Sequence, residues 1–148
     1  KAYWLDDPIW QGLRRYVEDS LVIKDWFELT LAQNLLLDGL TYPLMYQHLD
    51  RQLGEEGAGD LSMLTEFMRD LYAESTRWVD AMLKVVLAES DANRAQVQAW
   101  VDVWEPRAYE ALLQLAEVAT GRDALDEVRT ALAARLHKLG LHSPGVAL

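Results

Sequence analysis

The residues of this chain that could carry out chemistry are its carboxylates and its three histidines, and the chemistry they suggest is iron binding inside a helical bundle. Bundles that hold two iron ions use a Glu-x-x-His motif on each of two helices, because side chains at i and i+3 point at the same ion. No glutamate of this sequence has a histidine three positions after it. His48, His137 and His142 each have an apolar residue three positions before them. The sequence therefore predicts no site of this kind.

Other common catalytic and cofactor motifs are also missing. The chain has no cysteine, which excludes disulfides, thiol catalysis and thiolate metal sites. It has no serine, histidine and acid set and no glycine-rich phosphate loop. Residues 54–60, GEEGAGD, lack the ligand spacing of a calcium loop, and their three glycines predict a linker. We expect no cofactor and no catalytic residue in this chain.

Two alternatives remain open for the polar residues of the apolar region. Glu28, Thr30, Gln33 and Asn34 could line a pocket, but hydrogen bonding across helices is the favoured interpretation, since buried polar groups need partners. We likewise expect His48 to be a surface or interface residue. If the chain did bind iron in an unfamiliar arrangement, the ligands to test would be Glu18, Glu28, Glu74 and Glu110.

The elements that would position these residues are helices. Residues 26–46, the second half of the stretch 16–46, are apolar on several faces, which is typical of a helix buried on all sides. A chain of 148 residues supplies about one layer of neighbours, so we expect another protein chain to cover at least one face of this helix. Glu28, Gln33, Asn34, Asp38 and Pro43 interrupt the apolar run, which argues against a membrane span.

The apolar spacing predicts an all-α fold, because no segment alternates at period two with β-branched residues. After a cap at Asp7 and Pro8, one helix of roughly 45 Å is predicted to reach Gly39, with a shorter helix following to residue 53. Further helices are predicted over 62–88, over 91–119 with a kink or a split at Pro106, and over 123–139. The prediction is thus one bundle domain over 1–148 with a flexible tail at 140–148.

The six tryptophans divide into two groups. Trp10, Trp78, Trp100 and Trp104 lie on predicted core stripes, as do Phe67, Leu71 and Val85 of the 62–88 helix. Trp4 and Trp26 lie off these stripes, and buried interfaces are enriched in tryptophan. The predicted interface residues are Trp4, Trp26, Leu29, Leu36, Tyr42 and Tyr46.

The formal charge of −10 argues against nucleic-acid binding, which needs clustered lysine and arginine. Neither membrane nor nucleic acid is therefore an expected partner, and cytoplasm is the default compartment. The chain begins at Lys1 without a start methionine, so we expect N-terminal sequence to be missing.

Residues 3–46 and 64–84 carry a family resemblance. The pattern DW-x-E-x-x-x-A-x-N occurs as Asp25, Trp26, Glu28, Ala32 and Asn34. In this pattern the chain resembles the β subunit of the hydroxylase of bacterial multicomponent monooxygenases, in the phenol and toluene hydroxylase branch. It would match the C-terminal portion of that longer subunit.

The resemblance implies a ferritin-like helical subunit without metal, paired with a catalytic α subunit that carries a di-iron centre. It further implies a dimer of αβ or αβγ units on which a reductase and a regulatory protein act, with phenol, toluene or other hydrocarbons as substrates. The role of this chain would be structural. Two competing hypotheses are a helical homodimer unrelated to oxygenation and a self-contained bundle that binds metal through carboxylates.

Overall fold

The computed structural model describes residues 2–55 and 62–146. The predicted loop at 54–60 lies mainly outside these residues. The helices are α1 (Ala2–Asp6), α2 (Pro8–Ser20), α3 (Trp26–Thr30), η1 (Leu31–Leu37), α4 (Asp38–Pro43), η2 (Leu44–Leu49), α5 (Asp50–Glu55), α6 (Ser62–Glu89), α7 (Asp91–Ala119) and α8 (Arg122–Lys138). Both η segments are π-helical. The described residues contain no strand, so the all-α prediction is confirmed.

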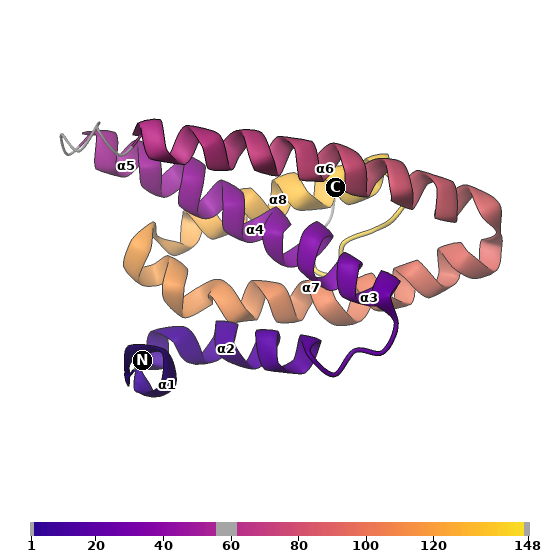
Figure 1. The fold of residues 1–148 in the computed structure, drawn as a ribbon, viewed down its shortest axis with the longest axis horizontal. Helices are drawn as coiled ribbons and strands as arrows, with labels where there is room; N and C mark the ends of the chain where they lie inside the picture. The colour runs from indigo at the N-terminus through magenta and orange to yellow at the C-terminus, as the bar shows by residue number, and fades with distance from the viewer. Residues whose placement is uncertain (1, 56–61, 147–148) are drawn as a thin grey trace.

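The long helices lie side by side in a bundle. Figure 1 shows α6 and α7 along the two long sides, joined at one end, with the helix from α3 to α5 crossing in front of α8 between them. The short α2 lies along the outer side of α7 (Figure 1). The helix from α3 to α5 is thus the central element, as its composition predicts.

The boundaries of the first helices differ from the prediction. One helix from Pro8 to Gly39 is wrong, because α2 ends at Ser20 and α3 begins only at Trp26. The Asp25 side chain caps the new helix by accepting a hydrogen bond from the Phe27 amide at 2.8 Å. The predicted cap at Asp7 is present, since its carboxylate accepts from the Ile9 amide at 3.0 Å.

The predicted break after Gly39 is also wrong. The helix runs through Pro43 to Glu55, and its hydrogen-bond register widens to π directly after the proline. A proline inside a helix leaves a carbonyl one turn earlier without its amide partner, and a register change is one way to absorb this defect. Pro106 likewise stands inside α7, which remains one helix rather than two.

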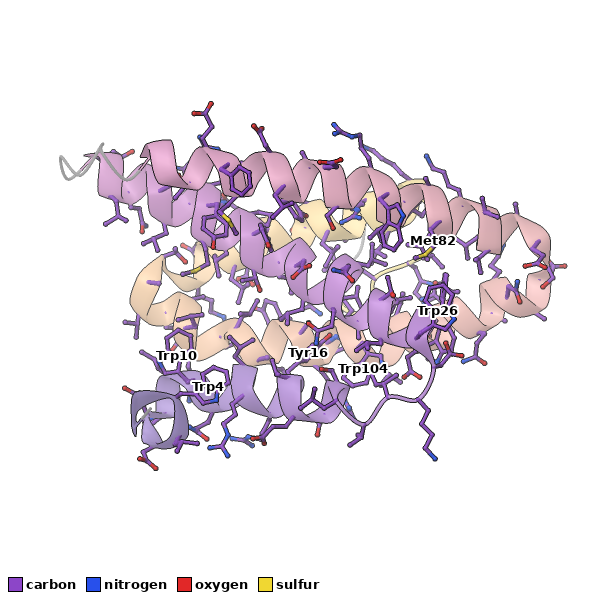
Figure 2. The ribbon with its side chains drawn as sticks, viewed as in Figure 1. Trp4, Trp10, Tyr16, Trp26, Met82 and Trp104 are labelled. Atoms are coloured by element: carbon purple, nitrogen blue, oxygen red, sulfur yellow. The ribbon has the colours of Figure 1, made fainter. Side chains whose placement is uncertain are left out.

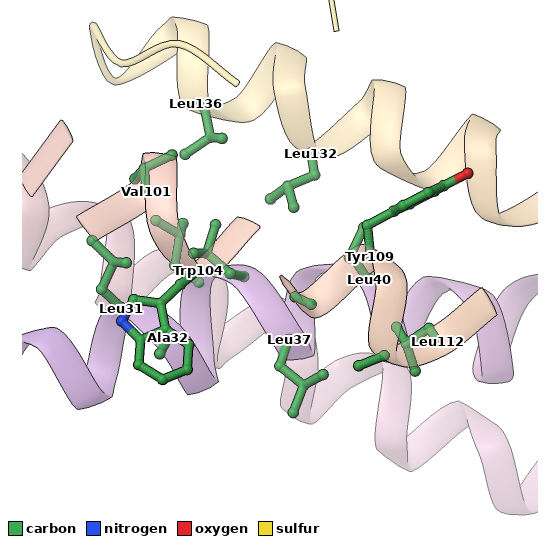
Figure 3. Close-up of a cluster of buried hydrophobic side chains, with 14 of the residues drawn as sticks. Leu31, Ala32, Leu37, Leu40, Val101, Trp104, Tyr109, Leu112, Leu132 and Leu136 are labelled. Carbon is green, nitrogen blue, oxygen red and sulfur yellow. The ribbon is translucent and has the colours of Figure 1, made fainter. Parts of the chain in front are cut away.

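The core forms around η1. Leu31, Ala32, Leu35 and Leu36 are fully buried in one cluster with side chains of α7 and α8. Figure 3 shows part of this cluster, in which Leu31, Ala32, Leu37 and Leu40 lie opposite Val101, Trp104 and Leu112 of α7 and Leu132 and Leu136 of α8. The region that the sequence marks as most apolar is therefore the centre of the core.

The C-terminal segment is packed up to Val146, contrary to the predicted flexible tail. Leu141 and Ser143 are buried, and Gln98 of α7 bonds the His142 backbone at both its amide and its carbonyl. The Arg129 guanidinium donates to the Pro144 carbonyl at 3.0 Å and also pairs with Glu105. The segment thus packs against α7 and α8, while residues 147–148 lie outside the described part.

A close helix approach at Gly12 gives a first test of this packing. A Cβ atom on Gly12 would stand 2.8 Å from the Ala111 carbonyl oxygen of α7, so Gly12→Ala must push α2 away from α7. We expect it to lower the free energy of unfolding by about 1–3 kcal/mol, measured by urea denaturation. Gly54→Ala is the matched control, because nothing lies within 4 Å of its Cβ position. Equal effects of the two substitutions would contradict the close α2 and α7 contact.

Candidate subunit interface

Large apolar side chains are exposed along α6. Phe67, Leu71, Trp78 and Val85 were predicted to lie in the core, but they are 69%, 44%, 57% and 71% exposed. At 3.6 residues per turn these four positions fall within roughly 40° of one another around the helix, so they form a single stripe. The core prediction is wrong for these four because α6 turns Val79, Leu83 and Leu87 toward the core instead. Its apolar surface is wider than its neighbours in the described residues can cover.

The helix from α3 to α4 lies beside this stripe and adds to it. Trp26 is 67% exposed and Leu29 is 36% exposed. Tyr42 of α4 stacks on Tyr72 of α6, with ring centroids 5.1 Å apart. We call the surface made by α3, α4 and the α6 stripe the docking face; its residues are Trp26, Leu29, Tyr42, Phe67, Leu71, Trp78 and Val85.

A groove of about 230 Å³ divides the docking face between α4 and α6. It is lined by Asn34, Asp38, Tyr42, Leu71, Tyr72 and Ser75. Asp38 accepts a hydrogen bond from the Asn34 side chain at 3.1 Å. Burial raises the pKa of Asp38 above its ordinary value, and this hydrogen bond partly offsets the effect.

Of the four polar residues of the apolar region, Glu28 and Gln33 form the predicted hydrogen bonds across helices, whereas Thr30 and Asn34 bond within their own helix and Asn34 lines the groove. The Trp104 indole donates to the Glu28 carboxylate at 2.8 Å, which joins α7 to α3. The Gln33 amide donates to the Ser20 hydroxyl at 2.7 Å, and Thr30 bonds the Trp26 carbonyl within its own helix. Figure 2 shows Tyr16 and Trp104 close together beneath the central helix, where their rings meet edge to face. This network holds α2, α3 and α7 together.

Among the residues that the structure describes, no three histidines or carboxylates come together as a metal site. Glu18 pairs with Arg14, and Glu28 receives the Trp104 indole. Glu74 is exposed on α6, while Glu110 lines a groove on α7 beside Arg107. These four glutamates therefore do not come together in the described structure.

His48 and His142 each lie beside a single carboxylate. The His48 ring lies 3.9 Å from the Glu127 carboxylate of α8, and the His142 ring lies 3.3 Å from Asp102 of α7.

Across residues 2–55 and 62–146, no helix has both the length and the apolar content to cross a bilayer.

Comparison with known proteins decides the family. The family model described as methane, phenol and alkene hydroxylase matches residues 1–90, more than half of the chain. The chain belongs to this hydroxylase family. The family resemblance that the sequence pattern indicated is thereby confirmed.

Several relatives place the chain within the phenol and toluene branch of the hydroxylase family. It is 76% identical to the phenol 2-monooxygenase oxygenase component DmpL of Pseudomonas sp. (strain CF600), over 97% of the chain and 43% of that protein. It is 30% identical to the hydroxylase component subunit beta of the toluene-4-monooxygenase system of Ectopseudomonas mendocina, over 78% of the chain and 36% of that protein.

The fold agrees with a solved member of the hydroxylase family. A chain of the crystal structure of xenon-pressurized phenol hydroxylase from Pseudomonas sp. OX1 matches with a TM-score of 0.93 at 57% identity. The match covers 98% of this chain and 44% of that one. The chain therefore spans less than half the length of the hydroxylase relatives it matches.

The structure separates the predicted interface residues of this hydroxylase chain. Trp26 and Leu29 lie on the docking face, and Tyr42 and Tyr46 are half-buried neighbours with ring centroids 5.3 Å apart. Trp4 is exposed but packs beside Trp10 at the opposite end of the bundle from Trp26 (Figure 2).

Leu36 is fully buried inside the core and offers no surface to a partner, so we remove it from the interface. It was chosen from an apolar region in which the inward and outward faces of the helix were not distinguished. The residues that sequence reasoning missed are those of the α6 stripe. Leu83 and Leu87 were the signal that could have found them, because they define a second apolar face on the same helix.

Proposed function

We propose that this chain is part of a non-catalytic structural subunit of the hydroxylase of a multicomponent monooxygenase. Its partner is a catalytic α subunit, which carries the di-iron centre. The observation that carries the proposal is the docking face, a set of large exposed apolar side chains on α3 and α6 of a chain that belongs to a hydroxylase family.

The composition of the docking face supports a protein partner. Soluble monomers rarely expose large contiguous apolar patches, and patches of this kind mark interaction surfaces. Trp26 and Trp78 are anchors of the type that dominates binding energy at interfaces. A permanent complex of this kind should bury more than roughly 2,000 Å² in total.

The names of the relatives support a wider assembly. They are components of phenol 2-monooxygenase and of the toluene-4-monooxygenase system. We infer a dimer of αβ or αβγ units that hydroxylates phenol, toluene or a related hydrocarbon with O₂, served by a reductase and a regulatory protein. We place this assembly in the cytoplasm.

Co-expression with the catalytic α subunit of a phenol hydroxylase tests the proposal. We expect the two chains to purify together as one heteromeric species by light scattering. A chain that stays separate from the α subunit and forms only dimers of itself would overturn the proposal in favour of a homodimer, in which the docking face pairs with its own copy.

A further inference from the structure

Asp38 is a half-buried carboxylate without a cation. No lysine, arginine or histidine among the described residues lies within ion-pair distance of it, and the Asn34 amide is its hydrogen-bond donor. A carboxylate removed from water and left without a positive partner costs free energy. The α4 and α6 groove therefore contains a negative charge that the described part of the chain does not neutralise.

Arginine is the cation that other shielded carboxylates of the described chain receive, although the half-buried Glu28 has the Trp104 indole as its donor instead. Three other carboxylates that are largely removed from solvent each pair with an arginine at 2.7–2.9 Å. The pairs are Asp50 with Arg69, Asp80 with Arg135, and Glu105 with Arg129. Where the described chain supplies a cation to a shielded carboxylate at these distances, that cation is arginine.

The walls of the groove suit a guanidinium group. The stacked rings of Tyr42 and Tyr72 stand beside Asp38, and Ser75 adds a hydroxyl. A planar guanidinium lies flat on an aromatic ring and presents a rigid fork of donors to a carboxylate, whereas an ammonium group binds the same partners as a point charge. Leu71 lies both in the groove and on the α6 stripe, so a partner seated on the docking face also covers the groove.

We propose that the groove between α4 and α6 receives the guanidinium group of an arginine from the α subunit, with Asp38 as its counter-ion. The inference rests on the proposed function and adds the chemistry of the partner to it. Asp38 fixes the position of the partner along the docking face, and the surrounding apolar side chains supply contact area.

The test uses the complex of this chain with the catalytic α subunit. We expect Asp38→Asn to weaken binding at least about 30-fold, because the partner guanidinium is then buried without its counter-charge. Glu117→Gln is the matched control, since it removes one exposed negative charge on α7 outside the docking face and should leave Kd unchanged. The free Asp38→Asn chain should unfold at the same or higher urea concentration, because the substitution removes a desolvated charge.

Each outcome separates the inference from the proposed function. Wild-type binding with an unchanged Kd for Asp38→Asn would overturn the guanidinium site and leave the structural role standing. Tighter binding by Asp38→Leu would show that the groove takes an apolar group, and carbodiimide coupling of Asp38 to a lysine of the complex would show an ammonium group. Failure of the wild-type chain to bind the α subunit would overturn both.

Discussion

Replacing Glu105 with alanine is expected to lower the free energy of unfolding by about 3–5 kcal/mol. The Glu105 side chain is fully buried, and its two oxygens accept hydrogen bonds from Arg129 at 2.7 and 3.0 Å. Arg129 also donates to the Pro144 carbonyl and lies 4.2 Å from the centre of the Tyr109 ring. Loss of Glu105 leaves a largely buried guanidinium without its counter-ion and loosens the C-terminal segment.

Urea denaturation checks this result, with Glu117→Ala as the control, an exposed carboxylate on the same helix that should change stability by no more than about 0.5 kcal/mol. The double variant Glu105→Leu with Arg129→Met should recover much of the loss, because an apolar pair of similar volume often replaces a buried ion pair at little cost. A loss below about 1 kcal/mol for Glu105→Ala would contradict a buried pair that depends on both partners.

Substitutions on the docking face are expected to have the second large effect, a loss of affinity for the α subunit. Substituting Trp26→Glu and Trp78→Glu together should weaken binding to the α subunit by more than about 100-fold, because two aromatic anchors are replaced by charges that must be desolvated. Both side chains are more than half exposed in the free chain, so its stability should change little.

Affinity is measured on the purified components, alongside the unfolding midpoint of each free chain. Val118→Glu is the matched control, since Val118 is 70% exposed on α7 and lies outside the docking face. Equal binding by the double variant and the control would place the interface elsewhere on the surface.

Much of the fold could be predicted because local chemistry determines it. Apolar periodicity predicted helices, and Asp7 with Pro8 predicted the start of α2. Gly121 and Gly140 have φ angles of 89° and 78° and follow the ends of α7 and α8, as expected of glycine beyond a helix. These signals act within one or two turns of the chain, so a single sequence contains them.

Other features depend on contacts that the spacing of residues does not express. The apolar residues Leu21 and Ile23 were predicted to continue the helix, yet the chain breaks there and Asp25 caps a new helix. Pro43 predicts an end of helix, but the π-helical register after it lets the helix continue.

For the interface, too, local sequence signals could be predicted and contacts between helices could not. Trp26 and Leu29 could be selected because they depart from the core stripe of their helix. The α6 stripe could not be separated from the core, since α6 has two apolar faces and only packing decides which of them turns inward. Asp38 had no special signal, because the absence of a cationic partner is visible only once the surrounding helices are in place.

The location of iron tests the structural role most directly. Metal analysis should be made on the purified chain alone and on its complex with the α subunit, together with the mass of each species. The structural role predicts that the chain alone holds no stoichiometric iron and that the complex holds two iron ions per α subunit, as expected of a di-iron hydroxylase. Stoichiometric iron in the chain alone, with oxygen consumption on reduction, would contradict it.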